Sequence, residues 1–116
     1  MESLELANQI VEILVDKQGE DILVLDLQEV TTFTDYFVIC SGTSQRQLLA
    51  LKGAITEALK QGDERVLPYH IEGESDGGWV LLDYNSVIVH LFSPEKRDYY
   101  DLEGFWQNAR VVVRIQ

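Results

Sequence analysis

The sequence predicts an α/β protein with a mixed β-sheet of about five strands and flanking helices. Three observations lead to this prediction. An amphipathic helical pattern opens the chain, two short and nearly continuous apolar runs follow it, and two more apolar runs further on are separated by two turn residues. Continuous apolar runs are typical of strands covered on both faces, so helices are expected to pack against the sheet.

The first half is expected to contain a helix, two strands and a second helix. The first helix spans residues 3–18, because apolar side chains recur there at helical spacing, with Ser3 as its cap and Gly19 at its end. Residues 22–25 and 36–40 read as the two strands. A second helix begins where Ser44 and Gln47 form a capping-box pattern, and Gly62 lies where a C-terminal glycine belongs.

The second half is expected to be mostly strand, followed by helix. Residues 66–71 predict a short edge strand, because Pro68 cannot donate to a central ladder. Residues 79–84 and 87–92 flank Asn85-Ser86, the spacing of a tight hairpin.

Ser93-Pro94 then predicts a helix start, a capping residue followed by proline at the first helical position. Gly104 lies inside the helical region that follows, which favours two short helices over one. The whole chain, 1–116, is read as one domain, with residues 110–116 as an extended tail.

The charge balance points to a basic protein partner. Twenty acidic residues face nine Lys and Arg, a formal net charge of -11. Such a chain repels phosphate backbones and anionic lipid, so free nucleic acid and membrane are not expected partners. The alternative reading is that the acidity serves only solubility. The single cysteine, Cys40, the absence of a long apolar run and the acidic start of the chain favour a cytoplasmic location.

No constellation of residues predicts a metal or cofactor site. Cys40, His70 and His90 lack metal-ligand spacing. A nucleophile and base can be imagined from Cys40 or Ser41 with His90, but a small thiol at the end of an apolar strand is usually structural. If Val87, Val89 and Leu91 face the core, His90 faces the opposite side, where a structural or an interface role is favoured over a catalytic one.

The turn over residues 42–44 opens the second helix and is a weak candidate for an anion site. It matches neither the P-loop nor the dinucleotide fingerprint. A strand, a Gly-Ser turn and a helix also occur in nucleotidyltransferases, but the paired carboxylates that hold magnesium there do not follow this turn. We therefore predict no catalytic residue, and a nucleotidyltransferase-like enzyme remains an alternative.

Aromatic side chains gather in the last third of the chain, with Arg97 among them. Aromatics and arginine carry most of the binding energy in protein interfaces. The alternative is that they build the core, but one hairpin and helix cannot easily bury all of them. The seven are Trp79, Tyr84, Phe92, Tyr99, Tyr100, Phe105 and Trp106.

Several sequence blocks, in order, resemble the Iojap-like or ribosomal-silencing-factor family. The resemblance runs from the first helix to about Ala109, and separate blocks in the right order are more specific than any single motif. The blocks are residues 35–42, 44, 46–47, 72–73, 78–84, 87, 89–92, 97, 99–100, 102–103 and 106.

This resemblance implies a nucleotidyltransferase-like fold without the catalytic acids, and a function without chemistry. Family members bind large-subunit ribosomal protein fourteen, obstruct joining of the two ribosomal subunits and repress translation when nutrients are limiting. They are often homodimers away from the ribosome. The other alternative is an adaptor for a different basic protein.

The resemblance also implies where the partner binds, because the strongest signature covers the hairpin and the following helix. Asp83 and Glu103 are expected to meet Lys or Arg of the partner while the aromatics anchor it. The expected partner-binding residues are Trp79, Asp83, Tyr84, His90, Phe92, Arg97, Tyr99, Tyr100, Leu102, Glu103 and Trp106.

Overall fold

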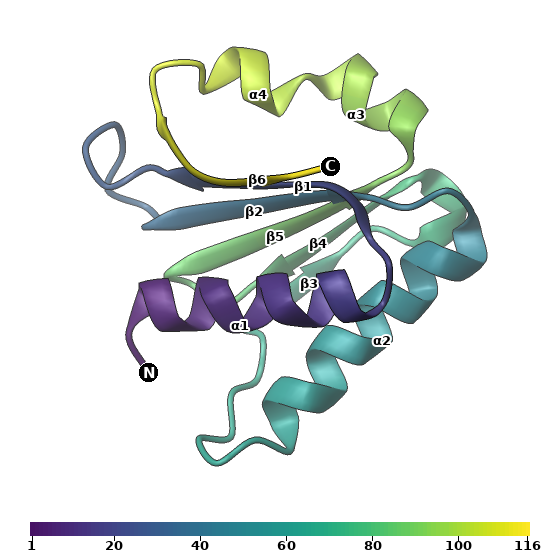
Figure 1. The fold of residues 1–116 in the computed structure, drawn as a ribbon, viewed down its shortest axis with the longest axis horizontal. Coiled ribbons are helices and arrows are strands. Elements are labelled where there is room, and N and C mark those ends of the chain that lie inside the picture. Colours follow the sequence, from purple (N-terminus) through teal and green to yellow (C-terminus); the bar gives the residue numbers. More distant parts are fainter.

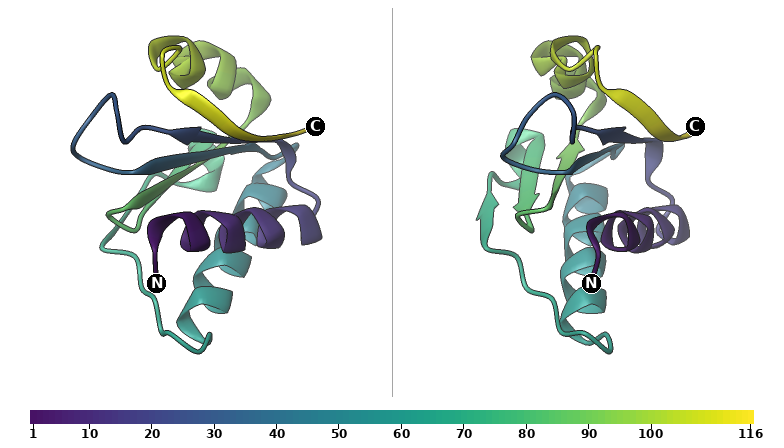
Figure 2. Two further views of the ribbon diagram at one scale, coloured as in Figure 1. Left: turned by 60° about the vertical axis from the view of Figure 1, so that its left-hand side comes forward. Right: turned by 90° about the vertical axis from the view of Figure 1, so that its left-hand side faces the viewer.

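A computed structural model describes residues 1–116 as a mixed six-stranded sheet between two layers of helix (Figure 1). Helices α1 and α2 cover one face, and the shorter α3 and α4 cover the other. Figure 2 shows the same layers from two further directions. The predicted α/β class with a mixed sheet is confirmed. None of the helices combines the length and the apolar character that crossing a membrane requires.

The elements follow the predicted order, with one strand added at the end. Strands β2 and β5 are buried along their whole length, as their continuous apolar sequences predict. The elements are α1 (Ser3–Asp16), β1 (Glu20–Asp26), β2 (Tyr36–Ser41), α2 (Gln45–Lys60), β3 (His70–Glu72), the 3₁₀ turn η1 (Ser75–Gly77), β4 (Trp79–Asp83), β5 (Val87–Phe92), α3 (Pro94–Tyr100), α4 (Leu102–Phe105) and β6 (Arg110–Ile115).

The strand order across the sheet is β3-β4-β5-β2-β1-β6. Only the central β2–β5 pair is parallel, and the other four pairs are antiparallel. The last residues pair with β1 as strand β6, so the segment is an edge strand of the sheet. Within β6, Val112 is the extra residue of a β-bulge, because Val24 pairs with Val113 and Leu25 with Val111.

Local sequence signals fix several turns as predicted. The hairpin turns over Asn85-Ser86, closed by a 2.9 Å bond from the Tyr84 amide to the Val87 carbonyl. Asn85 adopts a positive φ of 72°, which asparagine tolerates. Ser93 caps α3 by accepting from the Lys96 amide at 3.2 Å.

The cap of α2 is only half of the predicted capping box. Ser44 Oγ accepts from the Gln47 amide at 3.0 Å. The Gln47 side chain does not return to the Ser44 amide. Its Oε1 accepts from the Thr43 amide at 2.7 Å, and its Nε2 donates to the Gln18 carbonyl at 2.9 Å. The extra bond ties the start of α2 to the end of α1.

Two boundary predictions were wrong. Ser3 is the first residue of α1 rather than its cap, and Glu2 stands at the cap position without a side-chain bond. The third strand is shorter than 66–71, because its ladder with β4 starts only at His70. Gly62 follows the C-cap residue Gln61 of α2, as predicted, although it has no positive φ. The two short helices predicted after Ser93-Pro94 are confirmed, with the break at Asp101 rather than at Gly104.

Asp101 ends α3 and begins α4 in the left-handed conformation, with φ of 47°. Its Oδ1 accepts from the Gly104 amide at 3.1 Å, a local side-chain bond of the kind that makes aspartate a helix cap. A Cβ on Gly104 would collide with that carboxylate, so the glycine permits the cap rather than breaking the helix.

The sheet separates two cores of unequal size. Twenty buried residues fill the space under α1 and α2, including Leu51 and Ile55 of α2. Seven buried residues lie on the opposite face, among them Phe37 and Phe92. The alternation of β5 is as predicted, because Val87, Val89 and Leu91 face the larger core while Ile88 and Phe92 face the smaller one.

Candidate protein-binding surface

The smaller core is closed by residues 93–109, which we call the C-terminal cover. It contains α3, α4 and the turn that leads into β6 (Figure 1). Partly buried Trp79, Leu81, Leu102, Trp106 and Ala109 pack against the seven buried residues beneath it. The surface over this cover is the candidate site, since most of the predicted partner-binding residues belong to it or to the strands below.

An aromatic stack joins the hairpin to α3. The Trp79 ring lies 5.0 Å from the Phe92 ring, stacked at an interplanar angle of 26°. Tyr100 of α3 completes the stack, 4.4 Å from Trp79. Rings at these distances contribute about 0.5–1.5 kcal/mol per pair beyond their buried area. These contacts hold the short helix α3 against the sheet.

His90 lies inside this stack and is only 3% exposed. Its Nδ1 accepts a hydrogen bond of 3.2 Å from the Trp79 indole nitrogen, and the Phe37 ring meets it edge-on at 4.5 Å. Burial lowers the pKa of His90 to about 3, so the imidazole is neutral at neutral pH. Its Nε2 has no hydrogen-bond partner within the protein.

A second aromatic group holds α4. Trp106 follows α4 and lies 6.0 Å from both Phe33 and Phe37. Phe105 packs edge-on against Trp106 at 5.0 Å. Phe33 comes from the loop between β1 and β2, so the two ends of this group are more than seventy residues apart in sequence.

Arg97 links the cover to the sheet by polar bonds. Its side chain is 12% exposed. Its Nη1 donates to the Asp21 carbonyl at 2.6 Å and to Ser41 Oγ at 2.8 Å, and its Nε donates to Glu103 at 2.8 Å. One guanidinium therefore connects β1, β2, α3 and α4, a geometry that only the planar fork of arginine provides.

Four aromatic side chains on this side of the molecule remain exposed to solvent. Tyr99 is 76% exposed and Phe105 74%, whereas Phe33 and Tyr100 are 53% and 43% exposed. Single exposed aromatic side chains are common on soluble proteins, but a group of them is typical of an interaction surface. Lys96 lies 5.7 Å from the Tyr99 ring centroid, so this tyrosine also has a cation beside it.

The structure brings together most of the predicted site residues but gives them different roles. Tyr99, Tyr100, Leu102, Glu103 and Trp106 lie on the cover. The side chains of His90 and Phe92 are buried beneath it, and Trp79 is half-buried. Arg97 hydrogen-bonds to other residues of the protein rather than facing solvent.

Asp83 lies at the far end of the hairpin. Its carboxylate accepts from the Asn85 amide at 2.7 Å, which stabilises the turn.

Tyr84 is not brought to this surface. It is 4% exposed and packs in the larger core on the opposite face of the sheet. Its hydroxyl has no hydrogen-bond partner within the protein, and burial raises its pKa to about 12. Successive side chains along a strand point to opposite faces of the sheet. Tyr84, the first residue after β4, therefore points to the face opposite to that of Asp83.

Two of the four exposed aromatics on this side of the molecule were absent from the predicted partner-binding set. Phe105 was counted with the aromatic group but not assigned to the site. Phe33 was missed, because a single phenylalanine among threonines in a connecting loop carries no periodic signal. Its isolation in a polar loop is itself a signal, since a large apolar side chain there needs a partner.

The imagined catalytic pairs do not form. Cys40 faces the larger core and His90 the smaller one, so the sheet lies between them. Burial raises the pKa of the Cys40 thiol to about 12, which keeps it protonated. Ser41 Oγ accepts from Arg97, and His90 Nδ1 from Trp79.

The turn over residues 42–44 forms hydrogen bonds and packing contacts within the protein instead of presenting free amides to an anion. The Thr43 and Gln47 amides are already bonded to side chains. A Cβ on Gly42 would approach Leu48 to 2.8 Å, so this glycine allows strand β2 and helix α2 to pack closely. No group of three or more His, Cys, Asp or Glu side chains is placed to hold a metal ion.

The fold and the exposed aromatic surface define an α/β protein with a surface of the kind that binds other proteins. The family model described as ribosomal silencing factor during starvation matches residues 1–116. The chain belongs to this family.

Relatives and a solved structure agree with this membership. The chain is 40% identical over 95 residues to the ribosomal silencing factor of Bacillus subtilis, covering 81% of this chain and 78% of that protein. It is 37% identical to the mouse mitochondrial assembly of ribosomal large subunit protein 1, over 85% of this chain and 44% of that one. A crystal structure of a Chromobacterium violaceum protein superposes with a TM-score of 0.85 at 36% identity, over 92% and 88% of the two chains.

Proposed function

We propose that this protein silences ribosomes by docking its C-terminal cover on ribosomal protein fourteen of the large subunit. The observation that carries the proposal is the exposure of Tyr99 and Phe105 on a cover fixed by aromatic packing and by Arg97. Membership of the ribosomal silencing factor family supports the function, and the name of the mouse relative supports the large subunit as the partner.

The surface has the chemistry of a protein interface. Tyr99 and Phe105 supply rigid anchors that lose little conformational entropy on binding. Trp106 and Leu102 are half-buried beside them and extend the apolar area. One oxygen of Glu103 bonds to Arg97, and the other has no partner within the protein, so it is free to meet a cation of the partner.

The net charge of -11 favours a basic partner and disfavours bare RNA. It accelerates encounter with a positively charged ribosomal protein, and the association rate falls as salt rises. If the purified protein bound naked ribosomal RNA as tightly as it binds large subunits, the electrostatic part of the proposal would be wrong.

The mechanism is steric. A folded domain docked on the face of the large subunit that meets the small one occupies space that the small subunit needs. Translation is then repressed when nutrients are limiting, in the cytoplasm and without turnover or cofactor. The exposed residues of the cover bind the partner, and the buried ones keep the cover in place.

The test is the affinity of purified large subunits for Tyr99→Ala and Phe105→Ala variants. Each change should weaken binding by about 2 kcal/mol, roughly thirtyfold, if the ring is an interface anchor. Tyr69→Ala is the matched control, because Tyr69 is 79% exposed and lies before β3, away from the cover. Unchanged affinity in both folded variants would move the docking surface elsewhere.

Two further measurements define the partner. Isolated ribosomal protein fourteen should bind the wild type and lose affinity for the same two variants. Light scattering should show that the wild type slows joining of the two subunits, and that Tyr99→Ala does so only at higher concentration. Binding of a different basic protein through the same rings, without binding to protein fourteen, would instead support an adaptor.

We also infer that two copies associate when no ribosome is present, as the resemblance to the family implies. Sedimentation velocity across a range of concentrations tests this directly. A protein that remains monomeric at all concentrations contradicts the inference and leaves the docking proposal intact, because the two rest on different measurements.

A further inference from the structure

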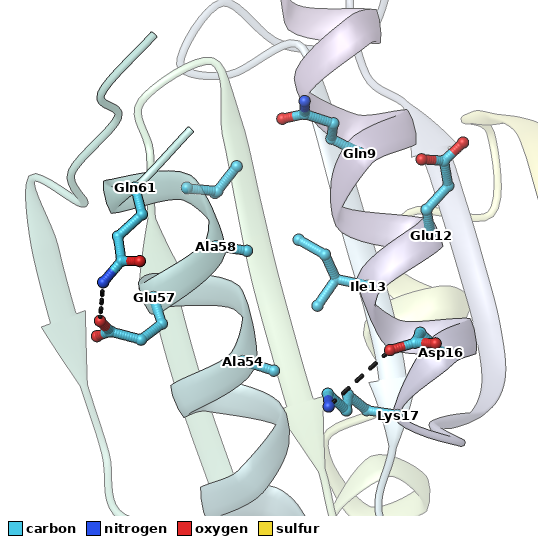
Figure 3. Close-up of a pocket in the computed structure, with 10 residues that line it drawn as sticks. Gln9, Glu12, Ile13, Asp16, Lys17, Ala54, Glu57, Ala58 and Gln61 are labelled. Atoms are coloured by element: carbon cyan, nitrogen blue, oxygen red, sulfur yellow. Dashed lines mark hydrogen bonds and ion pairs between the residues drawn. The ribbon is translucent and has the colours of Figure 1, made fainter. Parts of the chain in front are cut away.

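A groove lies between α1 and α2, on the side of the sheet away from the C-terminal cover (Figure 3). Its volume is about 590 Å³. Ile13 of α1 and Ala54 and Ala58 of α2 point into it. Leu59 also lines it. The two alanines are one helical turn apart and contribute only methyl groups, so α2 leaves the space beside α1 unfilled. The floor of the groove is therefore apolar.

The rim of the groove is acidic. Glu12 and Asp16 of α1 and Glu57 of α2 line it, and Lys17 is the only basic side chain in the lining. Lys17 lies 3.9 Å from Asp16, so its charge is already shared. A smaller hollow shares Gln9 and Leu59 with the groove and continues it toward the start of α1. The two together are lined by six carboxylates: Glu5, Glu12, Asp16, Glu57, Asp63 and Glu64. Of these, Glu64 pairs with the amino group of Met1 at 3.3 Å.

We propose that this groove binds a basic amphipathic helix of another protein. Small apolar side chains of such a helix would fill the space over Ala54 and Ala58, and its Lys or Arg side chains would reach the carboxylates on either rim. Helix α1 has 14 residues, about 21 Å of groove wall, which suits a partner helix of about four turns.

Charge identifies the occupant as another kind of protein rather than a second copy. The exposed face of α1 is itself acidic, so a second α1 in the groove would place carboxylates against carboxylates. The groove and the cover lie on opposite faces of the sheet (Figure 1). The inference thus goes beyond the proposed function, because both surfaces can be occupied at once.

The first experiment uses three synthetic 18-residue peptides and the full chain. One peptide has alanine and leucine on one helical face and lysine on the other. The second carries glutamate in place of lysine, and the third has the composition of the first in an order without an apolar face. Fluorescence anisotropy should show that the first peptide binds at least tenfold more tightly than either reference. Amide chemical shifts should change along α1 and α2.

The second experiment changes the groove. Ala58→Trp fills it and should weaken binding of the first peptide at least tenfold. Leu49→Trp is the control, because Leu49 is also on α2 but is 57% exposed and does not line the groove. The pair Glu12→Lys and Glu57→Lys should weaken binding similarly, whereas Glu74→Lys with Glu95→Lys makes the same charge change elsewhere. Circular dichroism confirms that each variant is folded.

Three results would overturn the proposal. Equal binding of the first and third peptides would show attraction to charge alone. Shifts centred on the C-terminal cover would place the peptide at the other surface. Self-association that Ala58→Trp abolishes would make the groove an interface between copies. Ala58→Trp should leave affinity for large subunits unchanged, so failure of this proposal and failure of ribosome docking give different results.

Discussion

The two faces of the sheet are covered by helices of very different length. One face lies under α1 and α2, of 14 and 16 residues, which together with the strands bury a core of twenty residues. The other face lies under α3 and α4, of seven and four residues, which close a core of seven. Neither α3 nor α4 contains a single fully buried residue.

This difference separates stability from recognition. Helices as short as α3 and α4 are not stable in isolation, so they depend on capping, on Arg97 and on aromatic packing. Their outer side chains take little part in holding the fold. The cover is consequently free to display Tyr99 and Phe105, while the long helices on the other face cover the larger part of the buried apolar core.

The largest expected effect compares the two cores directly. Leu51→Ala removes a fully buried side chain under α2 and should lower the free energy of unfolding by about 2–5 kcal/mol. Leu102→Ala acts on a half-buried residue of α4 and should cost about 1 kcal/mol. Urea denaturation measures both. Equal losses would mean that the cover contributes to stability as much as the long helices do.

Arg97 should matter more than an arginine on the surface. Arg97→Ala leaves its partners on β1, β2 and α4 without their donor, and a loss of about 2 kcal/mol in unfolding free energy is expected. Arg110→Ala is the control. Its pair with Asp26 is 3.0 Å long but its side chain is 77% exposed, so it should cost below about 1 kcal/mol. Comparable losses would contradict the linking role of Arg97.

The neutral His90 should make the smaller core sensitive to acid. Its pKa is about 3 in the folded protein and about 6.5 in the unfolded chain. The unfolded state therefore binds the proton first, and this contribution to stability, complete above pH 6.5, is lost progressively as pH falls toward 3. The slope approaches about 1.4 kcal/mol per pH unit.

Denaturation midpoints at pH 7 and pH 5 test this expectation. His90→Gln should show a smaller decrease between the two values than the wild type, and His70→Gln, at an exposed position, should behave like the wild type. A decrease that is identical in all three proteins would assign the acid sensitivity to carboxylates instead.

The smallest expected effect is on the outer surface of the cover. Tyr99→Ser should change the unfolding free energy by less than about 0.5 kcal/mol, because the ring is mostly in solvent. A much larger loss would mean that Tyr99 holds the cover in place, and it would weaken the division between stability and recognition drawn from the two faces.

Local signals in the sequence predicted most of the fold. The hairpin around Asn85-Ser86 and the start of α3 at Ser93-Pro94 depend on neighbouring residues, and both were found where expected. The pairing of β6 with β1 joins residues such as Asp26 and Arg110, 84 positions apart, and no local pattern reveals it. The end of α3 depends on the hydrogen bond that Asp101 accepts from the Gly104 amide. Composition alone suggested that the glycine itself divides the two helices.

The candidate site was predictable by region but not by role. Sequence blocks located the hairpin and the helices that follow. Whether a given aromatic is core or surface depends on the pleat and on what packs above it. Tyr84 and Phe92 are therefore buried, whereas Tyr99 and Phe105 are open. Phe33 joins the surface only because the loop before β2 folds back over Trp106.

Both edges of the sheet are protected against unwanted strand addition. Strand β3 is three residues long and follows soon after Pro68, so it offers little to pair with. Strand β6 carries Arg110 and Arg114 and is interrupted by its bulge at Val112, features that disfavour a seventh strand. Loss of β6 would uncover the apolar run of β1 as an open edge. The last strand thus protects the protein from aggregation.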